Sequence, residues 1–428
     1  MTDPTPKYEI TFLRHGESVG NAEGYHQGQA DFPLTDHGRF QAQALAEYWA
    51  SNQITFDQIF ASPLARARQT AEIINKTLKL PLSYNPMWME RDNGLLAGLP
   101  HAVAAERYPM PDSITLYQPT AQTGESLWEL YLRAARAIET IMQQPPGRYL
   151  IVSHGALLNM AFHTLLGLTP CPNYQGIVLP LNNTGLTRME YRLNEHRWRI
   201  HSHNEQPHLQ PNTTHKAASH NLEDIYQFTL LRHGESEGNV KGILQGQLDY
   251  PLTEHGQKQA EILAKHWSAD GTRFDKIITS SLQRAYQTAQ IISEKLQVPV
   301  ESNPAWIEFD WGQLNGLTGD EINQRQDIPW DNLYAKIGGD GESRWEVFLR
   351  ASRNVQDLMN LPPGRFLVVA HGAILSRFIF AILGIAPQNQ LHIAFKNTAT
   401  ANLRFLPKKH LWVLDDLNNY THLPSENF

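Results

Sequence analysis

The sequence is poor in the features that mark secreted, disulfide-bonded proteins. Among its 428 residues only Cys171 is a cysteine, which excludes a disulfide within the chain. The residues that follow Met1 lack the apolar core of a signal peptide. Because a low cysteine content is typical of reducing compartments, the sequence predicts a cytoplasmic protein.

Long apolar runs and an excess of positive charge are missing too. The two most apolar tracts, 157–168 and 374–385, are short and interrupted by polar residues, so we expect buried helices and no membrane span. A net charge of −7 gives no general attraction to nucleic acid or anionic lipid. An anionic substrate therefore needs a local cluster of positive side chains. No cluster of Asp and His has the spacing of metal ligands, so we expect neither a metal site nor a cofactor.

What the sequence does contain is a second copy of itself. Arg-His-Gly-Glu-Ser at 14–18 returns at 232–236. Further along, His-Gly-Ala at 154–156 returns at 371–373, so the second copy has lost a single residue between the two motifs. A repeat this long indicates a duplicated domain and not a solenoid of short repeats.

We predict one domain over residues 1–200 (copy one), a second over 224–428 (copy two) and a polar linker over 201–223. The linker is rich in His, Asn, Gln, Pro, Ser and Thr and has no apolar period. Its histidines are irregularly spaced and no cysteine accompanies them, so we interpret them as part of a solvated tether and not as a metal site. They are His201, His203, His208, His215 and His220.

Strand and helix patterns alternate within each copy. In copy one, apolar runs at 8–13, 56–61 and 148–153 predict strands, and Ser62 is expected to cap the helix that follows the second. Copy two repeats these elements at 227–231, 276–279, 282–296 and 366–370. The alternation predicts two tandem three-layer α/β/α domains, each with a mostly parallel central sheet. Ligands bind beyond the carboxyl ends of the strands in such folds.

The residues at these strand ends fit the chemistry of a phosphate ester. Such a group carries roughly two negative charges near neutral pH, and two arginines can hold its oxygens bidentately. A neutral imidazole can attack phosphorus in line, and a carboxylic acid can protonate the leaving alkoxide. A second histidine can hold a phosphate oxygen. The required set is two Arg, two His and one acid, acting on a small phosphorylated metabolite.

Three motifs resemble those of the histidine phosphatase superfamily, which includes the cofactor-dependent phosphoglycerate mutases. They are Arg-His-Gly-Glu-Ser after the first strand, Arg-Ala-x-x-Thr after the second, and Ser-His-Gly or Ala-His-Gly after the third, in both copies. The resemblance implies that His15 and His233 are the phosphorylated nucleophiles and that Glu90 and Glu308 are the proton donors. It also implies that phosphate is bound by Arg14, Asn21, Arg66 and His154 in copy one and by Arg232, Asn239, Arg284 and His371 in copy two.

Spacing within the copies supports one shared constellation. The interval along the chain from His15 to Arg66 equals that from His233 to Arg284. The interval from nucleophile to acid is likewise identical in the two copies. The two asparagines are less specific, because Asn21 and its counterpart can equally well cap a loop.

The type of phosphate chemistry is less sharply defined. The family's common Gly-x-Trp-Glu-Gly is absent from both copies. Paired arginines, which the mutases present after the proton donor, are also absent, so we predict a phosphomonoester hydrolase. Phosphoglycerate mutase-type phosphotransfer is the alternative, and a non-catalytic binding module is an alternative of another class. The sequence leaves the oligomeric state open.

The segments predicted to cover the two pockets differ in charge. Copy one has the weakly charged stretch 99–122, and copy two has the charged stretch 317–340, which includes Arg325 and Lys336. Loops carry specificity on a fixed scaffold. We therefore expect these two cations to make copy two accept more anionic leaving groups.

Overall fold

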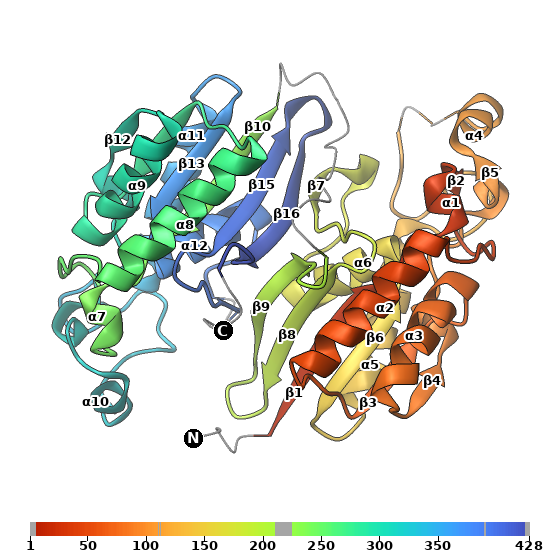
Figure 1. Ribbon diagram of the computed structural model, residues 1–428, viewed down its shortest axis with the longest axis horizontal. Helices are drawn as coiled ribbons and strands as arrows, with labels where there is room; N and C mark the ends of the chain where they lie inside the picture. Colours follow the sequence, from red (N-terminus) through yellow and green to blue (C-terminus); the bar gives the residue numbers. More distant parts are fainter. Residues whose placement is uncertain (1–5, 110, 112, 210–224, 389–390, 424–428) are drawn as a thin grey trace. The chain divides into compact units, whose positions relative to one another are not determined.

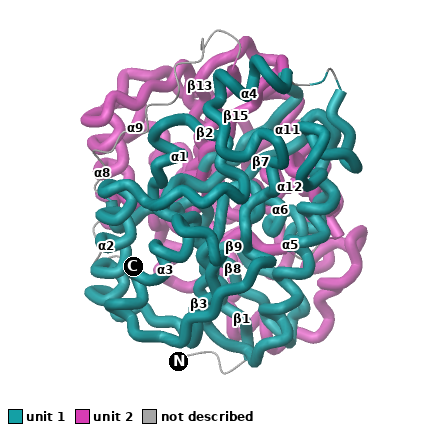
Figure 2. The backbone as a smooth tube through the Cα atoms, turned by 90° about the vertical axis from the view of Figure 1, so that its right-hand side faces the viewer, with its two compact units in different colours: residues 1–219, 409–415 teal, residues 220–408, 416–428 magenta. Residues whose placement is uncertain are grey.

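The computed structural model describes residues 6–109, 111, 113–209, 225–388 and 391–423. The chain divides into two compact units (Figure 2). Unit 1 comprises residues 1–219 and 409–415, and unit 2 comprises residues 220–408 and 416–428. Copy one therefore lies in unit 1 and most of copy two in unit 2.

The central sheet of unit 1 has the strand order β9-β8-β1-β6-β3-β4. Four strands run parallel: β1 (Lys7–Arg14), β6 (Arg148–Ser153), β3 (Gln58–Ala61) and β4 (Leu82–Tyr84). The sheet extends beyond β1 with β8 (Leu186–Arg192), which is antiparallel to β1, and then with β9 (Arg197–Glu205), which is antiparallel to β8. The three strands predicted for this copy are present, the second starting two residues later than expected.

Helices cover both faces of this sheet (Figure 1). They are α2 (Asp36–Ser51), α3 (Ala65–Leu78), α5 (Leu127–Met142) and α6 (Gly155–Leu166). Leu13 of β1 packs in a cluster with Trp49 of α2 and Ala71 of α3, whereas the ring of the preceding residue, Phe12, lies 5.4 Å from that of Phe162 in α6. Since successive strand residues point to opposite faces, the sheet is the middle layer of three, as predicted.

Shorter elements connect these layers. They are α1 (Val19–Ala22), β2 (Tyr25–His26), β5 (Leu99–Pro100), α4 (His101–Arg107) and β7 (Gly176–Val178), with 3-10 turns at Pro86–Trp88, Gly94–Leu96 and Pro172–Tyr174. Strands β2 and β5 pair antiparallel with each other and form a separate small sheet.

Unit 2 repeats this plan, with the strand order β12-β11-β13-β10-β15-β16. Its strands are β10 (Tyr226–Arg232), β11 (Lys276–Thr279), β12 (Val300–Ser302), β13 (Arg365–Ala370), β14 (His392–Ile393), β15 (Thr400–Leu406) and the part of β16 (Leu411–Asn419) that begins at Asp416. Its helices are α7 (Glu237–Val240), α8 (Glu254–Asp270), α9 (Gln283–Leu296), α10 (Gly319–Asn323), α11 (Arg344–Met359) and α12 (Gly372–Leu383), with 3-10 turns at Pro304–Trp306, Gly312–Leu314 and Pro407–Lys409. Strands β12, β11, β13 and β10 are parallel, and β15 is antiparallel to β10.

The register of the parallel strands brings their carboxyl ends together. In unit 1 Arg14 of β1 is in register with Ser153 of β6, and Ala61 of β3 with Val152 of the same strand. The residues that follow each strand therefore begin at the same edge of the sheet. This edge is where the sequence predicts the ligand.

The start of α3 differs from the sequence prediction. The helix begins at Ala65 with Leu64 as its N-cap, and no side chain of the cap residue bonds to it. The predicted cap at Ser62 is therefore wrong. The carboxylate of Asp31 accepts the hydrogen bond of the Ala65 amide instead, at 2.5 Å, so an acceptor from a distant loop satisfies the first turn. The Ser62 hydroxyl is left for another contact.

The predicted linker also begins too early. Residues 201–205 belong to β9, where His203 is buried and its Nδ1 lies 2.8 Å from Oγ1 of Thr187. The side chain of His208 contacts Thr184 at 2.9 Å. The polar composition hid this strand because its pairing with β8, and not an apolar period, stabilises it. Residues 210–223 of the predicted linker, with His215 and His220, lie outside the described residues.

Two glycines permit the close approach of the loop after β1 to the start of α2. A Cβ atom on Gly38 would lie 2.0 Å from the carbonyl oxygen of Glu17, and one on Gly16 would lie 2.5 Å from that of Gly38. Only a backbone shift can relieve such contacts.

Gly38→Ala is expected to lower the free energy of unfolding by about 1–3 kcal/mol, the usual cost of overpacking. Gly319→Ala is the matched control, because its Cβ would meet nothing within 4 Å. Urea unfolding of both variants measures the difference. Equal midpoints for the two would contradict the close packing of this loop.

Candidate active site

The backbone sets the orientation of the His15 imidazole at the end of β1. Its Nδ1 lies 2.7 Å from the carbonyl oxygen of Gly16. Because a carbonyl oxygen only accepts, Nδ1 carries the ring proton and the lone pair lies on Nε2. Gly16 is itself fixed, since its amide donates to Oγ1 of Thr70 at 3.0 Å. The fold therefore presents a single nitrogen of His15 that can act as a nucleophile.

The surroundings keep this imidazole neutral. Burial lowers the pKa of His15 well below 6.5, and the positive charges of Arg66 and Arg14 lower it further. The pKa of His154 is lowered well below 6.5 for the same reasons, burial being the largest. The ring centroids of the two histidines are 5.1 Å apart. At neutral pH two uncharged rings therefore lie beside two guanidinium groups.

Backbone carbonyls hold both arginines in place. Arg14 donates from Nη1 to the carbonyl of Leu181 at 2.6 Å. Arg66, 1% exposed, donates to the carbonyls of Ala30 and Gly28 at 3.0 and 2.7 Å. Burial lowers the pKa of Arg66 to about 10, so it stays charged at neutral pH. The Nε atom of each arginine is buried and meets no acceptor among the described residues.

Ser62 contacts the second histidine of the set. Nε2 of His154 lies 2.7 Å from the Ser62 hydroxyl, which also accepts the amide hydrogen of Leu64 at 3.3 Å. Nδ1 of His154 is buried and has no partner in the described chain. Sequence reasoning selected His154 but took Ser62 for a helix cap. The sequence does contain an indication of this role, because the serine recurs as Ser280 at the same offset at which Arg14 recurs as Arg232.

The carboxylate of Glu90 lies against the first turn of α6. Its Oε2 accepts from the amide of Ala156 at 3.2 Å, and its Oε1 accepts from those of Leu157 and Arg91 at 3.2 and 2.8 Å. A helix N-terminus favours negative charge. The charge of Glu90 also opposes the lowering of the pKa of both site arginines, so it lies close to them.

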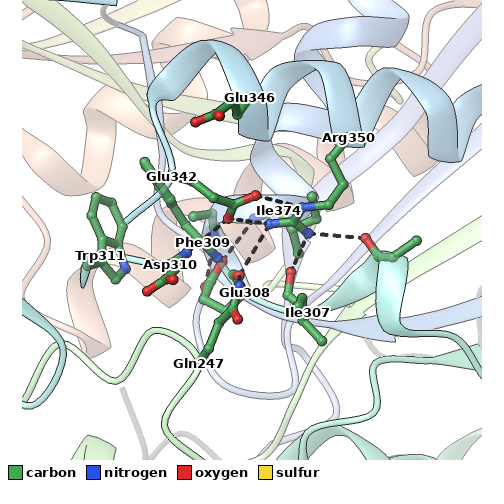
Figure 3. A network of polar contacts seen from close by, with 12 residues as sticks. Gln247, Ile307, Glu308, Phe309, Asp310, Trp311, Glu342, Glu346, Arg350 and Ile374 are labelled. Carbon is green, nitrogen blue, oxygen red and sulfur yellow. Dashed lines mark hydrogen bonds and ion pairs between the residues drawn. The ribbon is translucent and has the colours of Figure 1, made fainter. Parts of the chain in front are cut away.

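An ion pair that sequence reasoning missed holds the segment that carries the acid. In unit 2, Arg350 donates to Glu342 at 2.8 Å and to the carbonyl oxygen of Glu308 at 3.2 Å (Figure 3). In unit 1, Arg133 makes the same bond to Glu125 at 2.7 Å. The sequence does contain an indication of this pair. Its glutamate and its arginine recur in copy two at the same offset along the chain as the His-Gly-Ala motif.

Asn21 has a structural role in the loop after β1. Its side-chain oxygen accepts from the amide and hydroxyl of Ser18 at 3.2 and 2.9 Å, and from Nδ2 of Asn183 at 3.2 Å. Asn183 also donates to the carbonyl oxygen of His15. The expected loop cap is thus present, and a phosphate contact by Nδ2 of Asn21 remains a prediction. The sequence comparison did not identify Asn183, because the offset along the chain to its counterpart Asn397 differs from that of the His-Gly-Ala motif.

Unit 2 builds the same arrangement from its own residues. Nδ1 of His233 lies 2.7 Å from the carbonyl oxygen of Gly234, and Nε2 of His371 lies 2.8 Å from the Ser280 hydroxyl. The two rings are again 5.1 Å apart. Arg232, Arg284, Glu308 and Asn239 take the places of Arg14, Arg66, Glu90 and Asn21. All the predicted site residues therefore fall into two matching groups.

Each group combines charged guanidiniums, neutral imidazoles and one carboxylate. The buried Nε atoms of the arginines and Nδ1 of the second histidine are polar atoms that no described residue satisfies. Such a set suits a tetrahedral oxyanion beside the lone pair of an imidazole. Within the described ranges no group of three or more His, Cys, Asp or Glu side chains could hold a metal ion. No described helix is long and apolar enough to cross a membrane.

Fold and site together define a duplicated α/β/α protein with a matching cluster of two arginines, two histidines and one glutamate in each copy. The chain belongs to the histidine phosphatase superfamily (branch 1), whose family model matches it twice, over residues 10–206 and 228–420. The resemblance drawn from the motifs is thereby confirmed, and so is the tandem repeat.

Relatives match the chain over about half its length. The protein named probable phosphoglycerate mutase GpmB of Cronobacter sakazakii is 32% identical over 208 residues, covering 46% of this chain and 95% of the relative. The uncharacterized phosphatase PhoE of Bacillus subtilis is 33% identical over 200 residues, covering 47% and 96%. Among solved structures, a mycobacterial glucosyl-3-phosphoglycerate phosphatase aligns with a TM-score of 0.40 and 26% identity, over 45% of this chain and 99% of that one.

Arg325 and Lys336 belong to the segment 317–340 that is expected to cover the site of copy two (the lid), and both pair with neighbouring carboxylates. Arg325 contacts Asp327 at 2.6 Å, and Lys336 contacts Glu346 at 2.7 Å. Their charges are therefore balanced locally. The structure gives no support to the expectation that these two residues attract an anionic leaving group.

The buried neutral histidines make stability depend on pH. Below pH 6.5 the unfolded chain binds a proton at His154 that the folded chain does not, because the folded pKa lies well below that value. The free energy of unfolding therefore falls as pH falls, by about 1.4 kcal/mol per pH unit for this one group.

His154→Asn is expected to remove that contribution. Urea unfolding at pH 7.5, 6.0 and 5.0 should show a shallower loss of stability in the variant than in the natural chain. If the free energy of unfolding depends on pH equally in the variant and in the natural chain, His154 takes up its proton in the folded state as readily as in the unfolded one.

Proposed function

We propose that each copy hydrolyses a phosphate monoester of a small metabolite through a phosphohistidine, on His15 in copy one and on His233 in copy two. The observation that carries the proposal is the hydrogen bond from Nδ1 to the next residue's carbonyl, which leaves the Nε2 lone pair on a buried, neutral ring. Membership of the superfamily supports it, and so does the relative named as a phosphatase.

In the proposed complex, positive groups bind the oxygens of the phosphoryl group. Arg14 and Arg66 offset its charge, which grows on these oxygens in the transition state. Ser62 donates its hydroxyl hydrogen to Nε2 of His154. The ring proton of His154 is then on Nδ1, the buried atom without a partner among the described residues, and Nδ1 donates to a third phosphoryl oxygen.

In the first step Nε2 of His15 forms a bond to phosphorus as the bond from phosphorus to the ester oxygen breaks. Glu90, which carries a proton in the proposed complex with the dianionic ester, transfers this proton to the departing oxygen, which leaves as an alcohol. In the second step water attacks the phosphohistidine and Glu90 takes the proton. The bond from phosphorus to nitrogen breaks, inorganic phosphate leaves, and both side chains return to their starting state.

Transfer to a second hydroxyl, in place of water, is the second candidate. The relatives named as phosphoglycerate mutases favour it. Product analysis separates the two functions, because a mutase returns an isomeric phosphate ester and a phosphatase releases inorganic phosphate.

Each copy should trap phosphate on its own histidine. The full-length chain and its His15→Ala, His233→Ala and double variants are incubated with a ³²P-labelled phosphomonoester and quenched in alkali. Each single variant should retain about half of the acid-labile label and the double variant none, because each site holds one nucleophile. Label in only one single variant would show that the other copy is a binding module.

The acid should matter most for poor leaving groups. In a chain with copy two silenced by His233→Ala, Glu90→Gln should lower the rate on an alkyl phosphate by about 10²–10⁴-fold, the usual contribution of general acid catalysis. The loss on a nitrophenyl phosphate should be far smaller, since that leaving group departs without a proton. Equal losses on both esters would assign Glu90 a structural role.

A further inference from the structure

Copy two has two arginines where copy one is apolar. Arg377 lies in α12 at the position of Met160, and Arg344 begins α11 at the position of Leu127. Met160 and Leu127 are both buried. These two positions are therefore hydrocarbon in copy one and cationic in copy two.

Arg377 lies in the same helix, α12, whose first turn contacts Glu308, the proposed proton donor of copy two. It follows Ala373 and Ile374 by about one helical turn, so the three side chains share a face of α12. The amides of Ala373 and Ile374 each donate to the carboxylate of Glu308 at 3.1 Å, and Figure 3 shows Ile374 next to this carboxylate. The charge of Glu308 acts on Arg377 and raises its pKa, so this carboxylate lies within the electrostatic range of the guanidinium.

The guanidinium of Arg377 has no acceptor among the described residues. Its Nη1 is shielded from solvent without a hydrogen bond, and its Cζ lies 4.9 Å from the ring centre of Phe380. Burial and the charge of Arg344 lower the pKa of Arg377 to about 10, burial being the larger cause, and the charge of Glu308 opposes the change. Arg377 thus stays protonated at neutral pH, with both other charges close by.

Arg344 contacts the lid segment 317–340 through Trp330. It donates to the carbonyl oxygens of Trp330 and Pro387, each at 2.8 Å. The ring centre of Trp330 lies 6.3 Å from that of Trp311, and the Trp311 ring centre lies 4.0 Å from that of Phe309, the residue after Glu308. The two arginines therefore lie where the lid meets the segment that carries the proton donor.

We propose that Arg377, with the charge of Arg344 beside it, is a second anion-binding subsite of copy two. It lies on the side of Glu308, so it faces the leaving group and not the transferred phosphoryl group. Copy two then takes monoesters whose leaving group carries a carboxylate or a second phosphate, and copy one takes esters with uncharged leaving groups. The position of the leaving group rests on the proposed function.

The test compares esters that differ in one charge, in the full-length chain with copy one silenced by His15→Ala. One pair is phospholactate and isopropyl phosphate; the other is propanediol bisphosphate and propyl phosphate. Copy two should prefer the more anionic member, and Arg377→Met should lower that preference, as a ratio of kcat/KM values, by about tenfold or more, because a charge-assisted hydrogen bond is lost. The pair that responds distinguishes a carboxylate from a phosphate.

Arg325→Met is the matched control, since it removes a paired lid arginine and should leave the ratio as it is. An unchanged ratio in Arg377→Met, with unfolding midpoints equal to those of the parent, would overturn the subsite.

Binding separates this result from a failure of the proposed function. If copy two turns over none of the four esters, hydrolysis by that copy is wrong, and calorimetry with phosphonoacetate and propylphosphonate still tests the subsite. Copy one is the same in the parent and in the Arg377→Met variant, so it contributes equally to the binding that calorimetry measures. The difference between the two proteins therefore reports on copy two. Arg377→Met should weaken binding of phosphonoacetate about tenfold and that of propylphosphonate far less. Equal effects on both ligands would overturn the subsite.

Discussion

The hydrogen bond from Nδ1 of His15 to the carbonyl oxygen of Gly16 is the contact on which the rest of the site depends. It decides which ring nitrogen keeps its lone pair, and it holds only while the Gly16 carbonyl points at the ring. Thr70 fixes the Gly16 amide, and Gly38 allows the start of α2 to approach within a distance that no Cβ atom permits. The packing of the loop after β1 against the start of α2 thereby determines which tautomer the imidazole of His15 adopts.

The same positive charges serve two purposes in this pocket. Arg14 and Arg66 are placed to offset the charge of a phosphoryl group, and they also help to keep the pKa of His15 low. A protonated imidazole has no lone pair with which to attack, so in the proposed mechanism the charge that attracts the substrate also preserves the nucleophile. Burial is the larger cause for the histidine, and it is tolerated by the arginines because backbone carbonyls accept their hydrogen bonds.

How much of this could be predicted from the sequence depends on the range of each contact. Strands, their ends and residues such as His15 follow from local pattern and from the repeat. The cap of α3 could not be predicted, because Asp31 comes from a distant loop. Strand β9 was hidden because its stability comes from pairing and not from composition. Asn183 was missed because an alignment at a fixed offset pairs it with Thr400, whereas the structural counterpart is Asn397.

Duplication has kept the geometry of the proposed catalytic residues and changed the residues around them. The pair of rings is 5.1 Å apart in both copies, yet Phe309 and Trp311 stand where copy one has Arg91 and Asn93. The central claim is that the fold leaves Nε2, and not Nδ1, as the nucleophile in both copies. ³¹P NMR of the trapped, alkali-denatured phosphoprotein tests it most directly, because the two isomers of phosphohistidine have different resonances. Phosphate on Nε2 of both His15 and His233 is the predicted result, and phosphate on Nδ1 of either would contradict the account.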